Sequence, residues 1–515
     1  MKEHLLISFI KNNYKYIIFI LFIFFLNIYL FNKAFVINNI EKFNSKNCTL
    51  FIIFTLIELI YILMINIRCR NKYPLEKLFL ILILPIGLMY MLFLPFGSVP
   101  DEITHFSRIY SISDGHIVSE ASKDGNTYAQ IPTNIISTFY VGHNKKYNYI
   151  KNNFLEMPSK EKINTVFTNT ALYCFIIYIP QTIGVLIGKT INLPFILSMY
   201  LARLFNFITF VILMCFSIKL IPYLKKYLLL ISLLPIVLQE AVSFSSDALT
   251  ISISFFLISY VLYLKEKKDI LSKKDYIIII ISTIICSMAK IVYIPIIFLI
   301  YLLPKELFVS KKDKYIKLSL IILTCIIING AWTMYASRYL IEYNEGVNST
   351  GQIKYILSNP LKYIFCILRT IGYNGTGFVY QAYGRNLGLL NIDVGRFYPI
   401  CALFFSIYLS LTNRFKEKKN TLSEKIMYLL VPLGIICLIF TSLYIQWTPV
   451  SKEIVDGVQG RYFIPLLLFI PLILMRTNKS IDKFIINDNN ILKYIIIFII
   501  FENINAIAFI IVSNL

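Results

Sequence analysis

The stretch L-F-L-P-F-G-S-V-P-D-E-I-T-H, residues 92–105, marks the point at which a strongly apolar segment ends and a long polar segment begins. Two adjacent carboxylates, Asp101 and Glu102, follow directly on the apolar residues. Carboxylates at a membrane surface are costly unless they take part in chemistry or cap a helix. This stretch is therefore the first place in the chain to look for a function.

The composition of the whole chain indicates a membrane setting. The 515 residues are 57% hydrophobic and the mean hydropathy is +0.69, which is too apolar for a soluble protein built around one core. Apolar segments of about 20 residues, the length that crosses roughly 30 Å of hydrocarbon, recur from near residue 16 to the C-terminus. We predict an all-α polytopic membrane protein with no separate soluble domain.

The distribution of charge sets the expected topology. The formal net charge is +22, but the lysines and arginines cluster in short loops between apolar segments, as at 265–268, 311–312 and 414–419. This pattern is typical of cytoplasmic loops and argues against a nucleic-acid surface. The N-terminus is predicted to be cytoplasmic and the first apolar run to be an uncleaved span. The 9 cysteines are scattered and predict neither disulfides nor a metal site.

Basic loops placed on the cytoplasmic side give about thirteen predicted crossings. They cover residues 16–36, 49–66, 78–96, 195–219, 228–243, 246–264, 276–288, 290–303, 316–337, 396–413, 426–446, 462–476 and 493–514.

Two apolar segments do not fit this topology as single spans. Residues 171–191 are apolar enough to span, but a span there would place the following lysines outside, so we predict an interfacial helix with Gln181 and Lys189 on its polar side. Residues 276–303 are predicted to form a tight hairpin with Lys290 at its outer turn. The external segments are then 97–194, 338–395 and 447–461, and loops as long as the first two usually carry function.

Asp101, Glu102 and His105 are the first candidates for catalysis. A partly desolvated carboxylate at the outer headgroup level can act as a general base toward a hydroxyl group. The structural alternative is that Asp101 only caps a helix that begins after Pro100. On such a helix Asp101 and His105 share a face, which suits a hydrogen-bonded pair or two ligands of a divalent cation such as Mg²⁺ or Mn²⁺.

Charged residues in or beside the predicted spans form a second set of candidates. They are Arg203, Asp247, Lys290 and Arg461, and the topology places all four in the outer half of the bilayer. Three cations at one depth would suit the phosphate of a lipid, to which arginine offers a bidentate fork. The alternative is that Arg203 or Lys290 pairs with Asp247 or extends to the surface.

A third candidate region is rich in glycine and aromatic residues. It runs from Gly372 to Phe378 and continues to Tyr380 and Tyr383. The rings of Tyr373, Tyr380 and Tyr383 could stack on sugar faces in an external loop, with Asp247 as a further contact to sugar or acceptor. The alternative is a turn whose tyrosines anchor the membrane interface. The preceding residues 352–370 are predicted to form a second interfacial helix.

Five motifs carry a resemblance to a known family. They are V-P-D-E-I-T-H-F-S-R-I-Y-S-I-S-D-G (99–115), Y-I-P-Q-T-I-G (178–184), Y-L-A-R-L-F-N (200–206), S-S-D-A-L-T (245–250) and Q-G-R-Y-F-I-P (459–465). With them the chain resembles the bacterial membrane family called domain of unknown function 2142 (DUF2142), which is grouped with the GT-C glycosyltransferase superfamily. The likeness covers 78–476, which leaves 1–77 as two accessory spans and 477–515 as a C-terminal span.

The resemblance implies a GT-C-like membrane transferase that takes a sugar from a polyprenyl-phosphate donor on the outer face of the membrane. An acidic residue in the first large external loop of such enzymes acts as base or metal ligand, and Asp101 with Glu102 occupies that place. Arg203 and Arg461 match family arginines. The carboxylates are adjacent and not in a D-x-D motif, which leaves metal dependence open.

The expected reaction is transfer of one sugar to a hydroxyl on an envelope glycan, lipid or protein. Asp101 would deprotonate the acceptor, Glu102 or His105 would orient it, and Arg203, Lys290 and Arg461 would hold the departing phosphate. The alternatives are a transporter or flippase for a lipid-linked or anionic solute, and a non-catalytic scaffold for envelope assembly.

Overall fold

The computed structural model describes residues 73–123, 125–142, 145–339, 346–412, 421–474 and 488–514, with a few positions before residue 73. The predicted spans 16–36 and 49–66 lie outside these described residues.

Six helices in the described part of the chain are long and apolar enough to cross a membrane. They are α3 (Leu75–Phe93), α9 (Phe195–Leu220), α12 (Asp247–Lys265), α14 (Lys311–Ala336), α18 (Leu422–Gln446) and α20 (Asp488–Ser513). Each overlaps a predicted crossing, so these predictions are confirmed as helices of spanning length and support a multi-pass membrane protein. Their starts follow local rules, since Ser310 caps α14 and a Thr421–Glu424 capping box opens α18.

The other five predicted crossings within the described residues are shorter or broken, so the predicted number of about thirteen crossings is not confirmed. Residues 228–243 divide into α10 (Lys225–Ser232) and α11 (Pro235–Ala241), because Pro235 fits the first turn of a helix but not its interior. Residues 462–476 divide at the 3₁₀ helix η6 (Gly460–Leu466), which contains Pro465, and α19 (Phe469–Leu474). Residues 396–413 form α17 (Phe397–Thr412).

The predicted hairpin at 276–303 is present in outline. Its first arm is α13 (Lys273–Ala289), its second is the 3₁₀ helix η3 (Ile291–Leu302), and Lys290 joins them in an extended conformation. The short 3₁₀ helices η4 (Lys305–Leu307) and η5 (Ser337–Tyr339) flank α14.

Helix α12 lies in the interior of the bundle. In its most apolar stretch of 18 residues 89% of the residues are buried, compared with 94% for α20, 28% for α14 and 33% for α18. Helices α9, α13 and η3 pack around it. The N-terminal end of α12, which begins at Asp247, therefore lies inside the protein and not against lipid.

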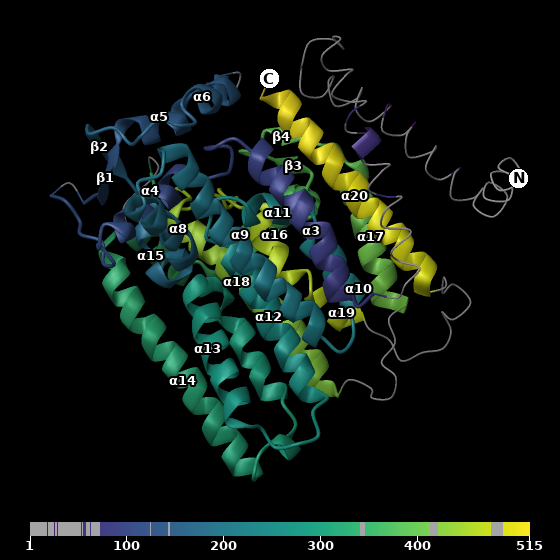
Figure 1. Cartoon of the computed structure of the whole chain (residues 1–515). Helices are drawn as coiled ribbons and strands as arrows, with labels where there is room; N and C mark the ends of the chain where they lie inside the picture. Colours follow the sequence, from purple (N-terminus) through teal and green to yellow (C-terminus); the bar gives the residue numbers. More distant parts are fainter. Residues whose placement is uncertain are drawn as a thin grey trace, which may run out of the picture.

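The first of the segments predicted to be external is a compact set of short elements at one end of the bundle (Figure 1). They are α4 (Glu102–Ser113), β1 (Tyr128–Pro132), α5 (Thr133–Tyr140), α6 (Lys146–Asn152), β2 (Lys162–Val166), α7 (Thr168–Ala171), the 3₁₀ helix η2 (Phe175–Tyr178) and α8 (Ile179–Thr190). Strands β1 and β2 pair antiparallel, with Tyr128 opposite Val166 and Pro132 opposite Lys162.

The prediction of an exposed polar side on helix 171–191 is wrong at Gln181. Helix α8 packs closely on α9 and α4, and the Gln181 side chain is fully buried. The approach to α9 is so close that a Cβ on Gly184 would lie 2.5 Å from the Cα of Ala202. Glycine permits this packing, and α8 is consequently part of the protein interior on that side.

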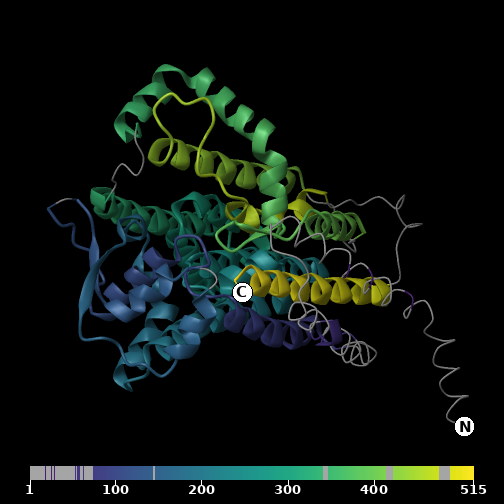
Figure 2. The ribbon, with the colours of Figure 1, turned by 90° about the horizontal axis from the view of Figure 1, so that it is seen from above.

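The second segment predicted to be external contains two helices and a short hairpin: α15 (Ser349–Ser358), α16 (Pro360–Ala382), β3 (Asn386–Leu387) and β4 (Ile392–Asp393). The prediction of a glycine-rich loop at 372–378 is wrong, since these residues lie inside α16. Viewed from above, the green helices form an arm that stands out from the bundle (Figure 2), with α15 packed on α18 and α16 packed on η6.

Candidate functional site

The two adjacent carboxylates point to two different arginines. Asp101 precedes α4 in the left-handed conformation, with φ of 61°, and its side chain makes no capping hydrogen bond. Its Oδ2 instead accepts from Arg461 Nη2 at 3.1 Å, while 48% of the side chain stays exposed. A non-glycine residue in this conformation costs about 1–2 kcal/mol, and such strain is often found at functional sites.

Glu102 faces away from this site and pairs with Arg203. The distance from Arg203 Nη2 to Glu102 Oε1 is 2.6 Å, and both side chains are fully buried. Glu102 also accepts from Gly97 N at 2.8 Å, and the Arg203 guanidinium donates to Leu94 O at 2.7 Å and to Pro95 O at 3.2 Å. These contacts therefore connect the residues that follow α3 to α4 and α9.

Glu102→Gln is expected to destabilise the protein by about 3–5 kcal/mol, because it leaves the Arg203 charge buried without a counter-ion. Arg203→Met should cost a similar amount, and the double variant should cost less than the sum of the two. Thermal unfolding of the purified protein in detergent measures all three. Strict additivity, or an unchanged unfolding temperature in either single variant, would contradict this role.

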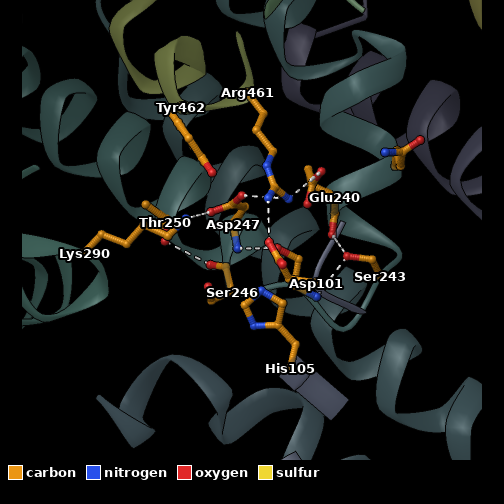
Figure 3. Close-up of polar contacts among 12 residues, drawn as sticks. Asp101, His105, Glu240, Ser243, Ser246, Asp247, Thr250, Lys290, Arg461 and Tyr462 are labelled. Atoms are coloured by element: carbon orange, nitrogen blue, oxygen red, sulfur yellow. Dashed lines mark hydrogen bonds and ion pairs between the residues drawn. The ribbon is translucent and has the colours of Figure 1, made fainter. Parts of the chain in front are cut away.

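Arg461 is the centre of a buried charged cluster (Figure 3). Besides Asp101, its guanidinium faces Glu240 Oε1 and Asp247 Oδ2, each 3.7 Å from Nη1. Asp247 also forms a close ion pair with Lys290. We call Asp101, Glu240, Asp247, Lys290 and Arg461 the Arg461 cluster; the residues come from the start of α4, α11, α12, the α13–η3 junction and η6.

The loop between α11 and α12 is fixed by two of the polar residues in the sequence motifs. Asn206 Nδ2 donates to Ser243 O at 2.9 Å, and Gln181 Nε2 donates to Ser245 O at 3.4 Å. The Ser245 hydroxyl accepts from Asp247 N at 3.1 Å. These bonds satisfy a buried, irregular backbone and set the direction in which Asp247 enters the cluster.

Glu240 is the member of the cluster that the sequence analysis missed. It lies in an apolar run that reads as part of a span, and Gln239 beside it was the one further polar signal. Its side chain is fully buried and neither carboxylate oxygen has a hydrogen-bond partner among the described residues. Glu240 therefore adds a third carboxylate, beside Asp101 and Asp247, to the two cations Arg461 and Lys290.

His105 lies beside the cluster and is buried (Figure 3). Its Nδ1 is 2.8 Å from the Tyr178 hydroxyl, and its ring stacks on Tyr173 with centroids 6.2 Å apart. Burial lowers the pKa of the imidazole to about 4, and the cations Lys290 and Arg461 act in the same direction against the carboxylates Asp101 and Asp247. The ring is therefore neutral at physiological pH.

Stability is expected to fall as the pH drops from about 6.5 toward 4, because the unfolded chain then binds a proton at His105 that the folded protein does not. Protonation of His105 in the unfolded chain lowers the free energy of unfolding by about 3 kcal/mol over this pH interval. Unfolding temperatures measured between pH 7.5 and 4.5 test this. His105→Gln should weaken the dependence of the unfolding temperature on pH. If this variant shows the parental pH dependence, His105 is not the group responsible.

A cavity of about 280 Å³ adjoins the cluster at Lys290. It lies among the α13–η3 junction, the C-terminal part of α14 and that of α18, and its lining is mainly apolar. Lys290, Tyr173 and Tyr462 line its polar end, where the Lys290 ammonium lies 5.5 Å from each ring centroid. Because α14 and α18 are the least buried of the six long helices, this cavity is bounded by the lipid-facing side of the bundle.

The residues present do not fit a metal site of the predicted kind. The Asp101 carboxylate and the His105 ring have separate partners, in Arg461 and Tyr178. Among the described residues, no group of three or more His, Cys, Asp or Glu side chains is placed to hold an ion. We therefore derive no step through a metal.

The predicted sugar-contact tyrosines are dispersed. Tyr373 is exposed on α16, Tyr380 is half-buried and Tyr383 is buried. None of the three lines the cavity beside Lys290. The structure thus brings together Asp101, His105, Asp247, Lys290 and Arg461, and it places Glu102 with Arg203 in a separate buried pair.

Comparison with protein families gives one match. The model of the family described as "Predicted membrane protein (DUF2142)" matches residues 82–470. This range includes every residue of the Arg461 cluster and the Glu102–Arg203 pair. No curated protein and no solved structure matches the chain.

Proposed function

We propose that this chain, which belongs to the DUF2142 family of predicted membrane proteins, is a membrane glycosyltransferase of the GT-C type. It would move a sugar from a polyprenyl-phosphate donor to a hydroxyl group of an envelope glycan, lipid or protein on the outer face of the membrane. The observation that carries the proposal is the position of Arg461, between a half-exposed carboxylate and a lysine at the end of an apolar cavity.

The two sides of the Arg461 cluster suit the two substrates. The Asp101 side chain is 48% exposed and can meet an acceptor from the aqueous side, whereas the Arg461 side chain is only 3% exposed. The cavity beside Lys290 is at the small end of ligand pockets, so it would take the first part of an isoprenoid chain and leave the rest in lipid. Arg461 and Lys290 would then bind the phosphate, which would compete with the Asp247 carboxylate that contacts both cations.

The transfer step follows from these positions. The acceptor oxygen attacks the anomeric carbon of the sugar, the bond from that carbon to the phosphate oxygen breaks, and Asp101 takes the acceptor proton. The products are the glycosylated acceptor and the polyprenyl phosphate. The leaving group is a weak base, so stabilisation of its charge by Arg461 and Lys290 matters more than an acid catalyst.

The ion pair between Asp101 and Arg461 suggests how the base becomes available. In the structure Asp101 Oδ2 accepts a hydrogen bond from Arg461 at 3.1 Å, so this oxygen is occupied. A donor phosphate that binds the guanidinium would compete with Asp101 and free its carboxylate. Proton abstraction would then begin only when the donor is bound, which limits unproductive chemistry.

A release assay tests the proposal. Purified protein is supplied with a polyprenyl-phosphate sugar labelled in the lipid and with a crude envelope acceptor fraction, and labelled polyprenyl phosphate is measured. Acceptor-dependent release supports transfer. Movement of intact donor across vesicles without release would support a transporter instead, and neither release nor movement would support a scaffold.

A further inference from the structure

A second cavity lies at the opposite end of the helices that hold the Arg461 cluster. Its volume is about 720 Å³, and it is formed by the C-terminal end of α12, the end of η3 and the first turns of α14 and α18. The cavity beside Lys290 is lined by the other ends of α14 and α18. The two cavities are therefore separated by the length of these long helices, and Figure 1 shows the first turns of α14 far from α4.

The lining of this second cavity is basic. Four lysines and two glutamates contribute to it, which leaves an excess of two positive charges. One lysine is neutralised, because Lys265 Nζ lies 2.7 Å from Glu424 Oε1 and 3.1 Å from the Tyr428 hydroxyl. The remaining three lysines are Lys305, Lys311 and Lys314, and Glu266 is the one other acid in the lining.

Lys314 distinguishes this cavity from an ordinary solvated basic loop. Only 8% of the residue is exposed, and its ammonium donates to Tyr301 O at 2.9 Å and lies 5.3 Å from the centroid of the Tyr315 ring. Glu306 is the nearby acid that favours its charged form, and the structure shows no ion pair for Lys314 among the described residues. A buried cation is costly unless it meets a partner.

The other side of the cavity is apolar. Tyr301, Leu302, Leu303, Pro304 and Met427 contribute to the lining. Lys311 begins α14, so the positive end of that helix dipole adds to the lysine charges at the same place. The lining thus combines fixed positive charge with an apolar wall, which suits a phosphate group attached to an apolar or glycerol portion.

We propose that this cavity binds a phosphate-bearing ligand at the end of the bundle away from the Arg461 cluster. The basic loops predict that this end is cytoplasmic, where anionic headgroups are abundant and attract lysines. The ligand is the headgroup of an anionic lipid or a free phosphate compound. This site is independent of the proposed transferase reaction.

Two probes distinguish these sources for the full-length protein purified in detergent. The first is phosphatidylglycerol, whose retention relative to phosphatidylcholine is measured by native mass spectrometry. The second is labelled inorganic pyrophosphate, measured by equilibrium dialysis. The test variant is Lys305→Gln/Lys311→Gln/Lys314→Gln. The matched control is Lys268→Gln/Lys273→Gln/Lys274→Gln, which removes the same charge from exposed residues on the neighbouring α12–α13 connection.

The test variant should lose about tenfold or more of the binding of one probe, and the control should stay within about twofold of the parent. Loss for phosphatidylglycerol identifies a lipid headgroup, and loss for pyrophosphate identifies a free phosphate compound. If the triple variant does not fold, Lys305→Gln/Lys311→Gln keeps the buried Lys314 and should still lose binding. The proposal is overturned if the parent binds neither probe, or if the test variants bind as the control does.

Discussion

Asp101→Asn is expected to lower the rate of sugar transfer by about 10²–10⁴-fold, the usual contribution of a general base. The amide keeps the size of the side chain and can still contact Arg461, so expression and unfolding temperature should change little. Donor binding should be retained, because an amide competes less than a carboxylate with the donor phosphate for Arg461. Turnover is measured as acceptor-dependent release of polyprenyl phosphate. Donor binding is measured separately with a labelled, non-transferable analogue.

Asp114→Asn is the matched control for this variant. Asp114 follows the other end of α4, and its carboxylate pairs with Lys189 at 2.5 Å on the protein surface. Surface ion pairs contribute little, so Asp114→Asn should transfer sugar at close to the parental rate. A parental rate in Asp101→Asn would show that Asp101 is not the base, even if release of polyprenyl phosphate itself is confirmed.

Arg461→Met should have the second large effect, because it removes the positive charge shared by Asp101, Glu240 and Asp247. Loss of one preorganised donor to a developing charge costs about 10²–10³-fold in rate. Removal of one member of a buried charged group also costs about 3–5 kcal/mol in stability. Both transfer and donor binding should therefore fall, in contrast to the result for Asp101→Asn.

Arg461→Lys separates charge from geometry. Lysine keeps the positive charge and most of the stability, but a single ammonium cannot reproduce the planar fork that faces Asp101 on one side and Glu240 with Asp247 on the other. We expect a folded protein with reduced donor affinity. Arg385→Met is the control, since Arg385 pairs with Asp393 at 2.7 Å outside the cluster. Equal losses in Arg385→Met and Arg461→Met would argue against a specific role for Arg461.

The long helices could be predicted from the sequence because their apolar runs are uninterrupted, as in α9 and α20. Hydropathy alone did not detect where prolines divide an apolar run, which is why residues 228–243 were predicted as one helix. The helix at 360–382 was predicted as a loop in part, because glycine and tyrosine favour turns in general. Tertiary packing of α16 on η6 outweighs that preference here.

The candidate site was predictable where a charge stands out from apolar neighbours, as for Asp247, Lys290 and Arg461. That these three side chains converge was a hypothesis from the sequence, and only the fold shows where they meet. Adjacent residues such as Asp101 and Glu102 looked equivalent, because the sequence does not specify the left-handed turn that directs one toward Arg461 and leaves the other with Arg203. Glu240 gave a weak signal, since one acid in an apolar run resembles an interruption of a span.

The spacing of these two ion pairs along the chain bears on how the protein is made. Glu102 and Arg203 are 101 residues apart, whereas Asp101 and Arg461 are 360 residues apart. During synthesis at the ribosome, the nearer pair can close while more than half of the polypeptide is still to be translated. That early closure would hold the Asp101 turn in place until Arg461, near the end of the sequence, emerges. A nascent chain truncated before residue 461 should therefore be well inserted yet inert.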